Sequence, residues 1–337
     1  MKTIDLRNAF PIRTSALPGG RWLLGLGIFA VLLSAFWLSG LASEEEAVVR
    51  SASTSYGTAL FFSAIIGYIV PVFGFISERT QAAIDLLEAD LAAEPEEVQR
   101  WREGIYRKPL AWLVSVLLIG LVSGTAHNAL LYGSVGELLT SGLASPPEAA
   151  TTLGTLLTWV VMTTVIAALL DNAHTLRRSA RVCRVDLLNT HRLRPFATVA
   201  VISTLALIGA QAAFPLMAVE NELEAVTYVP GLLATGIPML ILAALPVWPI
   251  HRRMAQARHL ALADINNQIA RLPAVDTRRP DTVAALAPLL AYRRELREVS
   301  VWPFDAGVLT RLALYLIIPP LTWVGAALIE NVVNAFL

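Results

Sequence analysis

Seven stretches of the chain are apolar and long enough to cross a lipid bilayer, and this restricts the fold more than any other feature. The hydrocarbon core of a bilayer is about 30 Å thick, so about 20 apolar helical residues span it. Backbone amides in lipid must be bonded within their own segment, which favours helices. The sequence therefore predicts an all-α, polytopic integral membrane protein with seven transmembrane helices. The expected spans are 22–41, 58–76, 110–131, 151–170, 196–217, 229–248 and 308–336.

The composition agrees with this class of protein. Apolar residues make up 55% of the chain and charged residues 15%, and the mean hydropathy is +0.60, whereas soluble domains carry about 25% charged residues. Basic and acidic residues both number 26, so the net charge is zero. A neutral chain has no overall attraction for nucleic acid, and we expect no such partner. The single cysteine, Cys183, excludes an internal disulfide framework.

The basic residues predict the direction of threading. Of the 26 Lys and Arg residues, all except Arg50 fall in segments that a seven-span chain places on one side. Acidic residues mark the opposite loops, at 44–46, 137, 148, 220, 222 and 224. Cytoplasmic loops of membrane proteins are enriched in Lys and Arg. We therefore expect a multi-pass protein of the bacterial inner membrane, with the N-terminus in the cytoplasm and the C-terminus outside.

The same reading divides the chain into regions. Residues 1–21 form a cytoplasmic N-terminal tail, and the first span is an uncleaved anchor, because it exceeds the length of a signal peptide's apolar core. Residues 22–248 form six transmembrane helices with cytoplasmic connections at 78–108 and 171–195. Residues 249–307 are a cytoplasmic helical hairpin, and residues 308–337 are the seventh helix.

Apolar spacing supports the hairpin. The first arm carries a stripe of Leu262, Ile265, Ile269 and Leu272, and the return arm carries Val283, Leu286 and Leu290. Residues three and four apart share one face of a helix, so each stripe needs a partner. The two stripes are expected to cover each other. Oligomerisation or the docking of another protein is the alternative use.

Sequence signatures of enzymes are missing. The chain has no His-Glu-x-x-His zinc motif, no P-loop or Gly-x-Gly-x-x-Gly nucleotide motif, and no Gly-x-Ser-x-Gly nucleophile turn. Ser123 and His127 lie on one predicted helix, which does not suit a nucleophile and its base. We expect no enzymatic activity, no cofactor and no metal site.

Polar residues at membrane depth are the candidate binding site. Such groups are costly in hydrocarbon and usually face the interior of the bundle or a cavity. Counting 1.5 Å per residue from the inner ends places them all in the outer half of the membrane. There they could line a cavity for a cation or a proton, or they could serve only as interhelical hydrogen bonds. The candidates are His127, Asn128, Gln211, Glu330 and Asn331.

Three further patterns concern helix contacts. Asp171 and Arg311 lie at the inner ends of their spans, and we expect an ion pair between them, as a clamp or a gate. Gly120 and Gly124 form a Gly-x-x-x-Gly face, which predicts a close helix contact. Prolines such as Pro238 and Pro319 free backbone carbonyls and bend helices, as in transporters.

The leading hypothesis is a channel- or transporter-like protein with a polar intramembrane cavity for an ion or small solute. The alternative is a non-transporting membrane scaffold or sensor that docks a cytosolic or membrane partner through its hairpin. The arginines of 177–184 are expected to contact anionic lipid headgroups, and a homo-oligomer is possible. The run from Arg184 to Asn189, followed by Pro195 and Phe196, resembles bacterial membrane proteins and implies no activity.

Overall fold

Helices account for nearly all of the computed structural model, which describes residues 3–9, 19–41, 56–218, 225–272 and 280–303 with residues 307, 310 and 317. The predicted all-α class is confirmed. The sequence did not predict the short ladder in which β1 (Thr3–Asp5) pairs antiparallel with β2 (Arg107–Pro109).

Six helical segments in the described residues are long and apolar enough to cross a membrane. They contain α2 (Gly20–Phe36), α3 (Tyr56–Leu87), α5 (Leu110–Leu131), α7 (Pro146–Val182), α8 (Arg194–Gln211) and α9 (Ala225–Ala244). Their length and composition are compatible with a multi-pass membrane protein. The predicted seventh span lies outside the described residues except for Thr310 and Ile317, so it remains a prediction.

Two of the predicted spans are completed by short helices of another type. The π-helix η1 (Trp37–Leu41) continues α2 to the predicted end at residue 41, and the 3-10 helix η5 (Phe214–Ala218) follows α8 to one residue past the predicted end at residue 217. α3 and α7 each continue past their apolar part into charged sequence, because helical hydrogen bonds are satisfied equally well in water and in lipid. Apolar length therefore predicted the membrane part of each helix and not its ends.

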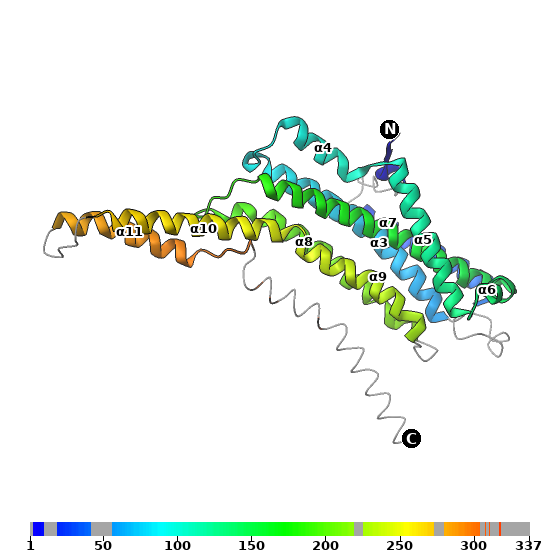
Figure 1. Cartoon of the computed structure of the whole chain (residues 1–337). Coiled ribbons are helices and arrows are strands. Elements are labelled where there is room, and N and C mark those ends of the chain that lie inside the picture. The colour runs from blue at the N-terminus through cyan, green and yellow to red at the C-terminus, as the bar shows by residue number, and fades with distance from the viewer. Residues whose placement is uncertain are drawn as a thin grey trace, which may run out of the picture.

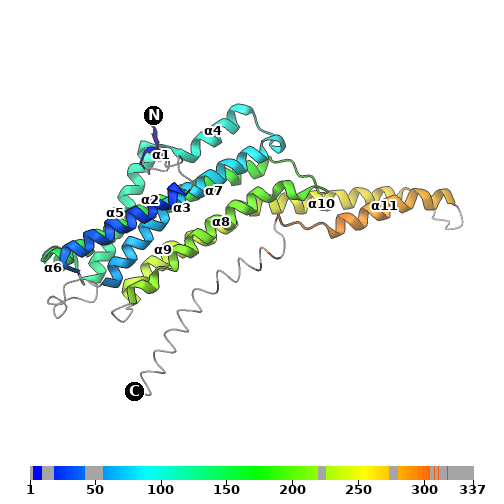
Figure 2. The same ribbon diagram turned by 180° about the vertical axis from the view of Figure 1, so that it is seen from behind.

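α3 is the central helix of the bundle (Figures 1 and 2). It contacts α2, α7 and α8, and most of its residues are buried. Its glycines allow close contacts: a Cβ atom on Gly67 would lie 2.8 Å from the backbone oxygen of Gly25 in α2. In lipid, helix association depends on such close packing, because lipid chains are as apolar as the helix faces.

The predicted Gly-x-x-x-Gly contact of α5 is confirmed. A Cβ atom on Gly120 would lie 2.8 Å from the Cα of Val160, and one on Gly124 would lie 3.2 Å from the Cα of Leu156. α7 is thus held against α5 at backbone distance. The opposite face of α5 exposes Leu118, Ile119 and Val122, as expected for a surface covered by lipid.

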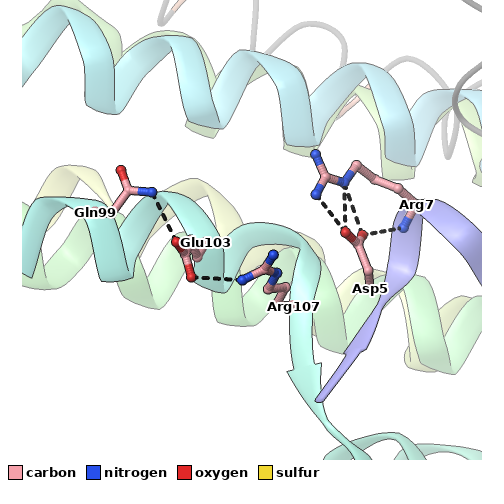
Figure 3. A network of polar contacts seen from close by, with 5 residues as sticks. All are labelled: Asp5, Arg7, Gln99, Glu103 and Arg107. Carbon is pink, nitrogen blue, oxygen red and sulfur yellow. Dashed lines mark hydrogen bonds and ion pairs between the residues drawn. The ribbon is translucent and has the colours of Figure 1, made fainter.

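The connections that the sequence places on one side gather at one end of the bundle. The tail strand β1 pairs with β2 before α5, Leu91 forms a β-bridge with Cys183, and Arg253 donates to the carbonyl of Arg181. Figure 3 shows Asp5 bound by Arg7 and, on α4 (Pro95–Tyr106) and β2, Glu103 bound by Gln99 and Arg107. Which side of a membrane this end faces remains a prediction.

The predicted hairpin is present as α10 (Val247–Ala270) and α11 (Pro280–Glu298), which extend beyond the end of the bundle (Figure 1). The predicted stripe on the return arm is wrong in part, because Val283 and Leu290 are each 44% exposed. The side of α11 that is turned inward carries Leu286, Leu289, Arg293 and Leu296 instead, with Leu296 fully buried. The packing of α11 against α10 fixes this rotation, and spacing alone could not.

Substituting Gly120 with alanine tests the contact of α5 with α7. The added methyl group has no room against Val160, so we expect Gly120→Ala to lower the stability by about 1–3 kcal/mol. The matched control is Gly27→Ala in α2, where a Cβ atom meets nothing within 4 Å. It should keep or slightly raise the melting temperature in detergent. Equal melting temperatures for the two variants would contradict the close contact.

Candidate functional site

A cavity of about 250 Å³ lies among α3, α5, α7, α9 and η5, within the apolar part of the bundle. Aromatic rings, aliphatic side chains and threonines line it, and no charged side chain of the described residues does. The apolar lining includes Phe61, Phe62, Met162, Ala167, Leu170, Phe214 and Ala234, and the polar lining is His127, Trp159, Thr58, Thr151, Thr155, Thr158, Thr163, Thr227 and Thr235.

His127 is the predicted site residue that lies on the cavity, and both of its ring nitrogens have partners. Trp159 donates from its indole Nε1–H to Nδ1 of His127 at 2.8 Å. Because an indole N–H can only donate, Nδ1 carries no proton. The proton is therefore on Nε2, which lies 3.3 Å from the carbonyl oxygen of Val226 and donates to it. The hydrogen bonds define a neutral imidazole in a single tautomer.

A proline leaves the Val226 carbonyl on α9 available to accept this hydrogen bond. In a regular helix the carbonyl of Val226 would bond to the amide of the residue four positions later, which is Pro230 and has no N–H. His127 thus satisfies a carbonyl that Pro230 leaves without its helical donor. This joins α5 to α9, and Trp159 extends the link to α7.

The bonded His127 does not favour the predicted cation or proton site. A neutral imidazole with Nδ1 accepting and Nε2–H donating has no free lone pair for a metal ion. A proton could enter only if the bond from Trp159 broke. His127 fixes the helices around the cavity in this arrangement.

Three of the threonine hydroxyls, those of Thr151, Thr155 and Thr235, are bonded within their own helices. Thr151 donates to the carbonyl of Pro147 at 3.0 Å, and Thr155 donates to that of Thr151 at 3.0 Å. Such bonds turn a threonine's methyl group toward its surroundings. Thr158 differs, because its buried hydroxyl has no hydrogen-bond partner in the described structure. The hydroxyl of Thr158 is therefore a buried hydrogen-bonding group of the lining that is left for a ligand.

Two of the other predicted residues, Gln211 and Asn128, are not part of the cavity lining. Gln211 lies behind the cavity wall and donates from Nε2 to the hydroxyl of Thr235 at 3.1 Å. Asn128 is 1% exposed and donates to the carbonyl of Thr152 at 3.1 Å, so it serves the contact of α5 with α7. Glu330 and Asn331 lie outside the described residues, so their place in a site remains a prediction.

Sequence reasoning missed Trp159 and the threonines of the cavity. Threonine is uncharged and weakly polar, so it did not count as a polar group at membrane depth. The signal was present, because Thr151, Thr155, Thr158 and Met162 recur at three- and four-residue spacing on α7. A face of small hydroxyl residues on an apolar helix is a pattern that can be searched for.

The ion partner that the structure gives Asp171 is Lys108, at the basic end of α7. The ammonium group of Lys108 also donates to the carbonyl of Gly104 at 2.6 Å, and its side chain is 2% exposed. Burial lowers the pKa of Lys108, and the nearby Asp171 carboxylate opposes this shift. Arg311, the predicted partner, lies outside the described residues.

Cys183 offers no reactive thiolate. It is fully buried where α7 ends, and burial raises its pKa to about 11. A thiol with such a pKa stays protonated at neutral pH, and the thiolate is the nucleophilic form.

No protein-family model, curated protein or solved structure matches this chain.

Lys108 is buried and Asp171 is partly exposed, so we expect the loss of stability to depend on which of the two is substituted. Asp171→Asn should lower the free energy of unfolding by about 3 kcal/mol, because it leaves a buried ammonium without its counter-ion. Lys108→Met should cost less, because the Asp171 side chain is 45% exposed and stays hydrated. Chemical denaturation in detergent measures both.

Two further variants complete this test. The double variant should recover most of the stability lost in Asp171→Asn, since it removes both charges. Arg107→Met breaks the exposed pair with Glu103 and should change little. Equal losses for the two single variants would contradict a buried, charged Lys108.

Proposed function

We propose that the protein binds a small, mainly apolar solute with one hydrogen-bonding group in its intramembrane cavity. The observation that carries this proposal is the buried hydroxyl of Thr158, which has no hydrogen-bond partner in the described structure and lies on an uncharged lining with many apolar side chains. An apolar solute gains from burial, and its polar group would pair with a hydroxyl that is otherwise costly to bury.

This proposal changes the solute class expected from the sequence. An ion needs charged or strongly polar ligands in a cavity of low dielectric constant. The described lining has no charged side chain, and its neutral histidine has both ring nitrogens occupied. An uncharged solute therefore suits the cavity better than an ion.

A channel- or transporter-like role requires a wall that moves, and α9 is the helix suited to it. Pro230 and Pro238 both interrupt its backbone bonding. Among the described residues its outer surface exposes Leu233, Ile237 and Leu240, an apolar face suited to contact with lipid. We propose that α9 separates the cavity from the bilayer and that its displacement admits the solute.

The setting we propose is the bacterial inner membrane, with the arginine-bearing end of the bundle in the cytoplasm. Its support is the distribution of Lys and Arg along the chain, and the contacts that gather the basic connections at one end. We propose no catalytic role.

Filling the cavity tests solute binding. The probe is 10-bromodecan-1-ol, whose bromine quenches tryptophan, added to the full chain in lipid nanodiscs. We expect a saturable quenching component, because Trp159 lies on the cavity. Ala234→Phe should abolish that component, since the ring occupies the cavity. Leu233→Phe is the matched control, because the neighbouring Leu233 is 56% exposed, and it should bind as the wild type does.

Thr158→Val tests whether the hydroxyl of Thr158 contributes to binding in the cavity. It removes the hydroxyl at nearly constant volume, so the affinity for the alcohol should fall about fivefold. The affinity for 1-bromodecane, which has no hydroxyl, should not fall. Quenching that never saturates in the wild type, or that Ala234→Phe leaves intact, would refute the proposal.

A second candidate function is protein docking through the hairpin. Its support is the exposure of apolar residues on a segment that extends beyond the bundle: Leu260 is 59% exposed, and Val283 and Leu290 are 44% exposed. Larger exposed apolar patches commonly mark interaction sites. We propose a second copy of this chain, paired hairpin to hairpin, as the partner.

The molar mass of the protein in detergent tests self-association through the hairpin. The wild type in detergent should give a dimer by light scattering, and the double variant Val283→Ser, Leu290→Ser should give a monomer with an unchanged melting temperature. Glu295→Ser with Glu298→Ser, on exposed positions of the same helix, is the control and should remain a dimer. A monomeric wild type would remove this candidate.

A further inference from the structure

A second hollow lies at the basic end of the bundle, between the ends of α7 and α9 and the start of α10. Its volume is about 480 Å³. It is lined by Arg177, Arg181, Ile241, Ala244, Leu245, Trp248, Pro249 and Arg252, which we name the arginine groove. The cavity described above shares none of these residues.

The cations of the groove come from two helices that are fixed to each other. Arg177 and Arg181 lie one helical turn apart on α7, and Arg252 comes from the first turns of α10. The neighbouring Arg253 donates to the carbonyl of Arg181, which ties the two helices together at this point. Three guanidinium groups thus border one hollow.

These three guanidinium groups have no anionic partner among the described residues. The ion pairs of the described chain join other residues, and the groove lining contains no carboxylate. Arg252 instead lies over the ring of Trp248, with its central carbon 5.6 Å from the ring centroid. A cluster of guanidinium groups without counter-ions is suited to a phosphate group, which accepts their parallel hydrogen bonds.

The remaining lining distinguishes a lipid from a soluble anion. Ile241, Ala244 and Leu245 lie at the end of the membrane helix α9, where Ile241 is 42% exposed. The exposed apolar surface of α9 continues from there through Leu240 and Ile237. Trp248 is 50% exposed at the border of the two halves, the position that tryptophan favours at membrane interfaces.

We propose that the arginine groove binds the phosphate of an anionic glycerophospholipid, with the acyl chains along the exposed face of α9. The charged half of the groove matches the headgroup, and the apolar half matches the start of the chains. This goes beyond attraction between a basic surface and anionic lipid, because it assigns one bound lipid to three named arginines. It does not depend on solute binding in the cavity.

The test is native mass spectrometry of the full chain released from detergent with added lipid. The probes are phosphatidylglycerol and phosphatidylcholine with identical oleoyl chains, and glycerol 3-phosphate as the soluble phosphate. We expect one phosphatidylglycerol to bind about tenfold more tightly than phosphatidylcholine, because guanidinium groups attract an anionic headgroup. Glycerol 3-phosphate should bind far more weakly, since it lacks the chains.

Two sets of variants distinguish binding at the groove from a general effect of positive charge. Arg177→Gln, Arg181→Gln and Arg252→Gln together should remove the preference for phosphatidylglycerol. The control removes three exposed charges elsewhere: Arg178→Gln, Arg184→Gln and Arg271→Gln. It should keep the preference. If the groove variant fails to fold, the exposed Arg181→Gln alone should weaken phosphatidylglycerol binding at least threefold while the melting temperature stays unchanged.

Three results would overturn the proposal. One is equal binding of the two lipids by the wild type. Another is an equal loss in the control variant, which would make the effect one of general charge. The third is glycerol 3-phosphate binding as tightly as the lipid, which would assign the arginines to a soluble anion. The cavity variant Ala234→Phe should keep lipid binding, so the two proposals fail independently.

Discussion

The need to bond every backbone polar group inside hydrocarbon is the constraint on which this structure depends. It makes each span a helix, and a backbone group that lacks its helical partner must find another one. Pro230 deprives the carbonyl of Val226 of its helical donor, and the imidazole of His127 replaces that donor from another helix. Trp159 fixes the imidazole in the tautomer this bond requires. A proline in α9 is thus compensated by side chains of α5 and α7, and the cavity lies beside this junction.

One face of α7 connects the features proposed to bind ligands. Thr155, Met162 and Leu170 line the cavity, and the same helical face continues to Arg177 and Arg181 in the arginine groove. α9 follows a parallel course from Gly231 to Leu245. The seam between α7 and α9 is therefore apolar at membrane depth and cationic at its end, which is the polarity of an anionic lipid. The close contact of Gly120 with Val160 holds α7 against α5 along this seam.

The sequence predicted some features well because they depend on local chemistry. Span 110–131 coincides with α5, since apolar length decides where a helix can lie in lipid. Gly120 was predicted to permit a close contact, which depends only on the missing side chain. The features it did not predict concern the rotation of helices and the partners of side chains. Leu290 was assigned to the inner stripe of the hairpin, but Leu289 and Leu296 face inward, because packing against α10 sets how α11 is turned. Lys108 as the partner of Asp171 could not be found, since 63 residues separate them.

The sequence by itself determined that the chain is helical, that its long helices suit a membrane, and that its basic residues belong to one group of connections. These properties follow from transfer free energies summed over single segments. Only the tertiary structure decided that His127 is a bonded neutral imidazole, that Thr158 is left without a partner, and that arginines of α7 and α10 border one groove. Each of these depends on which helix faces lie opposite each other, and in lipid that choice is made by close packing between helices, which apolar composition does not encode.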